Sequence, residues 1–206
     1  MTWYLANVYN SAAIFIDEAG CNLRTHCTRG RSKIGLPAVQ IVANQRGRNM
    51  TIILALNITF GIVHYKIHFG GTRKEIFQEF DNEVSNKSAN SIAWLIMDNA
   101  TCHNVVLNNP IHKLKNLPPY SPPLNPVEEA FSCWKYALKA SLATQQNRIM
   151  DTVCAAAAGK NMVQWRSDIL QEIATECLNA ITIDKCVAWH AHMIKSLAKC
   201  NNMEDI

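Results

Sequence analysis

The segment from residue 92 to residue 134 constrains the fold most, because it joins a strand pattern to a helix pattern through a stiff turn. Residues 92–97 are all apolar and are followed directly by Asp98. A short apolar run bounded by polar residues is typical of a buried β-strand. The four prolines among residues 118–123 restrict the turn that follows and fix where the next element starts.

A helix is predicted to start at Asn125-Pro126, since Asn is a favoured N-cap and Pro suits the first helical position. The first turn then contains Glu128 and Glu129, whose charges complement the helix dipole. Acidic residues in a first turn commonly do no more than interact favourably with the helix dipole. Successive helical residues face different ways, so only one of the two is expected to point inward.

A third acid raises the prospect of a metal site. The apolar run of residues 14–16 stops at Asp17-Glu18, which predicts a core strand over residues 13–17 that ends in acids. Ligands bind at strand ends in open α/β folds. Two strands ending in acids and an acid opening a helix supply the oxygen ligands that Mg²⁺ prefers.

Three stretches together resemble the catalytic domain of mariner-type DDE transposases. They are Ile14–Glu18, Met97–His103 and Leu117–Glu128, and the segment Gln45–Asn49 is also similar. The third stretch is long and specific, whereas the first alone is a weak signal. The resemblance covers roughly residues 13–142.

This resemblance implies a site as well as a fold. The family's catalytic and metal-binding triad falls on Asp17, Asp98 and Glu128, and two Mg²⁺ or Mn²⁺ ions are its implied cofactors. Asn99 and His103 are expected to orient the ligands, and a core or surface residue without such a role is the alternative for His103. The implied fold is α/β, a ribonuclease-H-like mixed sheet flanked by helices, followed by a C-terminal helical extension. The implied activity is DNA cleavage and strand transfer on transposon ends and target DNA, in the nucleus, with a homodimer left open.

Cations between the early strands are candidate DNA contacts, because such loops are expected to flank the acids. The set is Arg24, Arg29, Arg31, Lys33, Arg46 and Arg48. Contacts of this kind position the phosphate backbone without reading sequence. The alternative is a solvated loop and a soluble hairpin tip.

The chain departs from the family in four respects. Pro123 stands where the family usually has Asp, and Cys21 stands where a bulkier residue is typical. The 29 residues between Asp98 and Glu128 are a few fewer than usual. Helix-turn-helix domains are expected to be missing before the triad. These departures keep open a catalytically impaired, DNA-binding or scaffolding remnant, and a nuclease of RNA–DNA hybrids ranks third.

Three regions are predicted: a leader remnant over 1–12, the DDE catalytic domain over 13–142, and the helical extension over 143–206. Within the second, residues 38–43, 50–56 and 62–69 have the pattern of antiparallel strands. The last of these is expected at the sheet edge far from the Asp98 strand.

Composition limits the remaining classes of protein. The 206 residues include 20 Lys and Arg against 16 Asp and Glu, a net charge of +4 that permits a nucleic-acid partner without requiring one. No apolar run approaches the roughly 18 residues of a membrane span, and the start lacks the pattern of a signal peptide. Eight cysteines occur without a Cys-x-x-Cys pair, which favours reduced thiols in an intracellular chain over disulfides or a structural zinc site.

Overall fold

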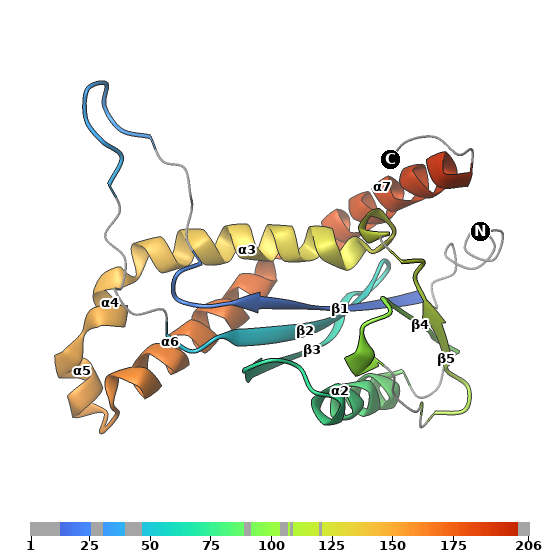
Figure 1. Cartoon of the computed structure of the whole chain (residues 1–206), viewed down its shortest axis with the longest axis horizontal. Coiled ribbons are helices and arrows are strands. Elements are labelled where there is room, and N and C mark those ends of the chain that lie inside the picture. The colour runs from blue at the N-terminus through green and yellow to red at the C-terminus, as the bar shows by residue number, and fades with distance from the viewer. Residues whose placement is uncertain are drawn as a thin grey trace.

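The computed structural model centres on a five-stranded mixed sheet and describes residues 13–25, 31–39, 47–88, 92–103, 107, 109–119 and 121–201 (Figure 1). The strand order is β3-β2-β1-β4-β5. The strands are β1 (Ala13–Cys21), β2 (Met50–Asn57), β3 (Gly61–Phe69), β4 (Trp94–Met97) and β5 (Lys113–Asn116).

The first three strands form an antiparallel meander, whereas β4 and β5 run parallel to β1. Strand β3 lies at the edge far from β4, as predicted. The meander contains no strand at Ala38 or Val39, and residues 40–43 of that predicted strand lie outside the described residues.

Helices cover both faces of the sheet, with α2 on one face and α3 on the other (Figure 1). The helices are α2 (Lys74–Lys87), α3 (Pro126–Thr144), α4 (Gln146–Met150), α5 (Thr152–Ala157), α6 (Met162–Glu176) and α7 (Ile183–Asn201), with short 3₁₀ turns η1 (Thr101–His103), η2 (Pro122–Leu124) and η3 (Cys177–Ala180). A mixed sheet flanked by helices, with further helices after it, confirms the predicted fold class.

Side-chain alternation along β1 decides which residues meet which helix. Ile14 and Ile16 pack in the cluster that includes α2, whereas Phe15 and Ala19 pack in the cluster that includes α3. Because strand residues alternate between faces, Asp17 lies on the α3 face and Glu18 on the α2 face. Neighbouring acids are thereby separated by the sheet.

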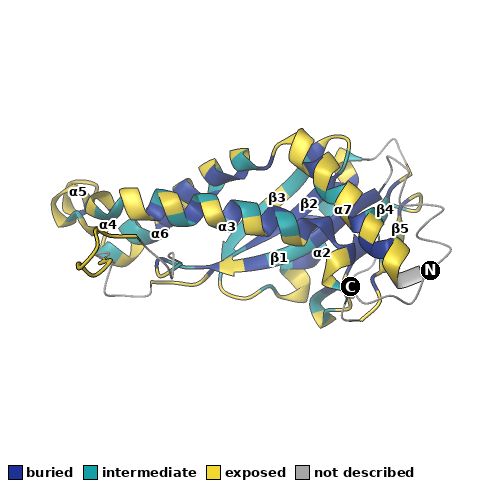
Figure 2. Ribbon diagram, turned by 90° about the horizontal axis from the view of Figure 1, so that it is seen from above, coloured by how far each residue is buried: buried dark blue, intermediate teal, exposed yellow. Residues whose placement is uncertain are grey.

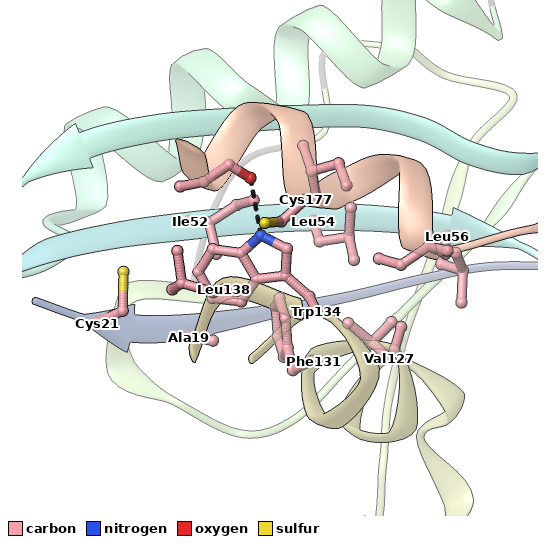
Figure 3. Close-up of a cluster of buried hydrophobic side chains, with 14 of the residues drawn as sticks. Ala19, Cys21, Ile52, Leu54, Leu56, Val127, Phe131, Trp134, Leu138 and Cys177 are labelled. Atoms are coloured by element: carbon pink, nitrogen blue, oxygen red, sulfur yellow. Dashed lines mark hydrogen bonds between the residues drawn. The ribbon is translucent and has the colours of Figure 1, made fainter. Parts of the chain in front are cut away.

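Helix α3 packs against one face of the sheet through its buried side chains. Its buried residues Val127, Phe131, Trp134 and Leu138 follow helical spacing and point into the sheet (Figure 3). The Trp134 indole N–H donates a 2.9 Å hydrogen bond to a backbone carbonyl of α6. Figure 2 shows exposed turns of α3 above strands that are mostly buried. The packing fixes the position of the helix start, which carries the acid predicted for the site.

One predicted boundary is wrong in a way that affects the site. Strand β1 does not stop at Asp17 but continues to Cys21, paired throughout with β2. The apolar run ends at Asp17 because burial changes there, not because the strand ends.

In the described part of the chain, no helix is long and apolar enough to cross a membrane.

Candidate active site

The three predicted acids, Asp17, Asp98 and Glu128, line one open pocket of about 450 Å³. They come from the middle of β1, the residue after β4, and the first turn of α3. The proline-rich segment between β5 and α3 forms another side of the pocket. The structure therefore brings together all three residues that the sequence singled out.

Asp17 reaches the pocket because β4 is shorter than β1. Strand β4 pairs with β1 only as far as Phe15 among the described residues, so the α3 side of Asp17 lies just beyond its end. The Asp17 carboxylate accepts hydrogen bonds from the Glu18 backbone N–H at 2.8 Å and from the Asn125 amide at 3.0 Å. The side chain is thus held in place from two directions.

Electrostatics makes the pocket suited to cations. The pKa of Asp17 is raised to about 7, chiefly by burial and further by repulsion from Glu128, Glu18 and Asp98, against the lowering effect of the Glu18 backbone hydrogen bond. A carboxyl that resists ionisation for these reasons is stabilised in its charged form by a bound cation. Crowded carboxylate oxygens are also the donors that Mg²⁺ and Mn²⁺ prefer.

His103 contacts the carboxylate of Asp98. Its Nδ1 lies 2.7 Å from Asp98 Oδ1, and its Nε2 lies 2.7 Å from Glu18 Oε2. The Ala100 backbone N–H also donates to Asp98 Oδ1, at 2.9 Å. Burial alone would lower the pKa of His103, but the hydrogen bond and charge of Glu18, with the charge of Asp98, raise it above its ordinary value. The predicted orienting role of His103 fits this geometry.

Two asparagines position the other parts of the pocket. Asn99 donates a 2.7 Å hydrogen bond to the Leu117 carbonyl, which ties the end of β4 to the proline-rich segment. Asn125 caps α3 by accepting from the Val127 N–H at 3.2 Å, and its amide also donates to Asp17. Sequence reasoning found only the cap. The second bond depends on the packing of α3 against β1, which no local pattern reveals.

Glu129 points away from the pocket. Its carboxylate lies 2.6 Å from His192 Nδ1 on α7, whereas Glu128 lines the pocket. This confirms that only one of the two adjacent acids faces inward. Glu129 therefore does not contribute to the lining of the pocket.

Within the described residues, the predicted DNA-contacting cations do not line the pocket. Those within the described residues are exposed: Arg24, Arg31, Lys33 and Arg48. They follow the end of β1 at Cys21, about 13 Å along the strand from Asp17, and residues 31–39 project away from the sheet (Figure 1). The Arg48 guanidinium lies 4.8 Å from the centre of the Phe69 ring. Arg29 and Arg46 lie outside the described residues.

Comparison with known proteins gives a family and a fold. The family described as DDE superfamily endonuclease matches residues 12–150. The solved Mos1 strand transfer complex is 15% identical with a TM-score of 0.53, over 92% of this chain and 57% of that one. The Mos1 mariner paired end complex with Mn is 14% identical with a TM-score of 0.53, over 92% and 58%.

These structural matches support the ribonuclease-H-like fold class at low sequence identity. The chain spans less than three fifths of the length of the chains in these two complexes. It matches no protein among those with curated functions.

Proposed function

Because this chain belongs to the DDE superfamily of endonucleases, we propose that it is a transposase-like domain that cleaves and joins DNA by phosphoryl transfer. The observation that carries the proposal is the meeting of Asp17, Asp98 and Glu128 around one open pocket. The likeness to Mos1 complexes solved as paired ends and after strand transfer supports transposon ends and target DNA as the partners.

Asp17, Asp98 and Glu128 would hold two divalent ions, Mg²⁺ or Mn²⁺. The donor set fits, since all three side chains offer carboxylate oxygens and Asp17 is disfavoured as an uncompensated anion. Mos1 paired end complexes were solved with Mn and with Mg. When bound, such a pair stabilises the attacking and leaving oxygens of an in-line displacement.

The chain's own residues keep the acids in position during the reaction. Asn125 orients Asp17, and His103 orients Asp98 through its Nδ1. The N-terminus of α3 at the pocket favours the negative charge of a phosphate.

In cleavage, the oxygen of water bonds to phosphorus and the bond to the 3′ oxygen breaks, leaving a 3′-hydroxyl. In joining, that hydroxyl attacks a phosphate of the target and displaces another 3′ oxygen.

Nicking of supercoiled plasmid tests the proposal directly. The wild-type chain should nick plasmid in the presence of Mg²⁺ or Mn²⁺ and not in excess chelator, and Asp98→Ala should be inactive. A folded wild-type chain that binds DNA without nicking it under any of these conditions would instead support the catalytically impaired remnant.

Divalent ions should stabilise the folded chain through the same acids. An ion at about 100 times its dissociation constant adds about 2.7 kcal/mol to the free energy of unfolding. Thermal melting in rising Mn²⁺ should therefore shift upward for the wild type and much less for Asp17→Asn, which lacks one carboxylate. Equal shifts in both proteins would remove Asp17 from the ion site.

The exposed cations after β1 should contribute salt-sensitive DNA binding. Each phosphate contact contributes about 0.9 to the slope of log affinity against log salt. Arg31→Ala with Lys33→Ala should flatten that slope by up to about two. Lys160→Ala, in the turn between α5 and α6 and paired with Asp168, is the control. A slope unchanged by the double substitution would assign these residues to a solvated loop.

A further inference from the structure

A second cluster of metal-ligating side chains lies on the α2 face of the sheet. It comprises Glu18 of β1 with Cys102 and His103 of η1, and one ligand atom from each lies within 4.8 Å of the other two. His103 Nε2 lies 2.7 Å from Glu18 Oε2, and Cys102 Sγ lies 3.5 Å from Glu18 Oε1. His103 is buried against Phe77 of α2, with ring centres 4.4 Å apart.

The donor set differs from that of the acid pocket. It offers one sulfur, one nitrogen and one oxygen, a combination that suits Zn²⁺ and not Mg²⁺. Three protein ligands with one open position are typical of a zinc site accessible to water. Alternation along β1 separates this cluster from Asp17, so the two sites use different faces of the sheet.

The other nitrogen of His103 is already placed as a zinc ligand requires. Metal-binding histidines commonly donate their second ring N–H to a carboxylate, which fixes the tautomer and the ring orientation. His103 Nδ1 lies 2.7 Å from Asp98 Oδ1 and 3.3 Å from the Asp98 backbone carbonyl oxygen, two acceptors that would keep the proton on Nδ1 when Nε2 binds a metal. The local packing against Phe77 holds the ring in this orientation.

We propose that Glu18, Cys102 and His103 bind a Zn²⁺ ion, at a site distinct from the pocket of the three acids. On binding, Cys102 loses its thiol proton to solvent and its sulfur bonds to the ion. His103 Nε2 releases to solvent the proton that it donates to Glu18 and binds the ion in its place, while Nδ1–H remains on Asp98. The ion would then fix Asp98 through one imidazole, which links it to the site of phosphoryl transfer without placing it there.

Cobalt substitution tests the site in the full 206-residue chain, since Co²⁺ bound to thiolate gives a sulfur-to-metal charge-transfer band in the near ultraviolet. The wild type should show this band at one equivalent of Co²⁺, and Zn²⁺ should remove it. Cys102→Ser should lose the band and weaken Zn²⁺ affinity by at least about tenfold. Cys154→Ser is the matched control, because Cys154 is an exposed thiol on α5, and it should behave as wild type.

Two further variants keep the outcome independent of DNA cleavage. Glu128→Gln should retain the band even if it abolishes nicking, because Glu128 belongs only to the acid pocket. Glu18→Gln should retain the thiolate band but bind Co²⁺ more weakly by at least about tenfold. A band that persists in Cys102→Ser, or its absence from a folded wild-type chain, would overturn the zinc site while leaving the proposed nuclease untouched.

Discussion

Replacing Glu128 with Gln is expected to abolish metal-dependent DNA nicking, whereas Glu129→Gln should nick at close to the wild-type rate. The two residues are adjacent in the first turn of α3 and have the same chemistry, but only Glu128 lines the pocket. Glu129 instead contacts His192 at 2.6 Å. We expect Glu128→Gln to slow nicking by at least about 100-fold, which corresponds to about 2.7 kcal/mol in the activation barrier.

The pair of variants also controls for effects on the helix. Each removes one negative charge from the first turn of α3, so each weakens the interaction with the helix dipole by a similar amount, about 0.3–1 kcal/mol. Initial nicking rates, measured at several Mn²⁺ concentrations on proteins of matched melting temperature, separate catalysis from stability. Equal loss of nicking in both variants would show that the substitutions act through the structure of the helix. Glu128 would then not be the third catalytic acid.

Local chemistry explains why α3 and β4 were predictable. Asn125 and Pro126 restrict the backbone in ways that favour a helix start wherever they occur, and the structure has the Asn125 cap. The apolar run before Asp98 forms β4, within two residues of the predicted start. Neither element depends on distant contacts for its identity, so the sequence was sufficient.

The end of β1 was not predictable in the same way. Apolar patterning reports burial, but the length of a strand is set by hydrogen bonding to its neighbour. Strand β2 continues alongside β1 to Cys21, and this keeps β1 extended past Asp17. The acid is accessible because β4 is short, a property of another segment 77 or more residues away in the chain.

Contacts between residues of neighbouring elements could also not be predicted from the sequence. The chain Glu18–His103–Asp98 joins residues from β1 and from the segment after β4, and it forms only when those elements are neighbours. Alternation along β1 predicts that Asp17 and Glu18 face opposite ways, but it does not identify their partners. Of the predicted cations, the described ones lie beyond the Cys21 end of β1 or just before β2, and residues 31–39 project away from the sheet instead of folding back toward the pocket.

Helix α2 contains a buried acid that should make stability depend on pH. Asp81 is fully buried, and neither carboxylate oxygen has a hydrogen-bond partner. Burial raises its pKa from 3.8 to about 6, with a smaller opposing effect from His112. Between these two values the folded chain binds more protons at this residue than the unfolded chain does. Asp81 therefore lowers stability progressively as pH rises from about 4 through 6.

Asp81→Asn should accordingly stabilise the chain at pH 8 by about 3 kcal/mol, the equivalent of a shift of about two pKa units. The gain should vanish below about pH 3, where Asp81 is protonated in both states and the amide resembles the neutral acid. Urea unfolding at a series of pH values measures the difference in unfolding free energy between the variant and the wild type. Contributions that both proteins share, such as that of Asp17, cancel in this difference. Glu75→Gln, an exposed acid in the first turn of the same helix, is the control and should change stability by less than about 1 kcal/mol. A difference between Asp81→Asn and wild type that stays constant from pH 4 to pH 8 would mean that the buried carboxyl never carries an uncompensated charge.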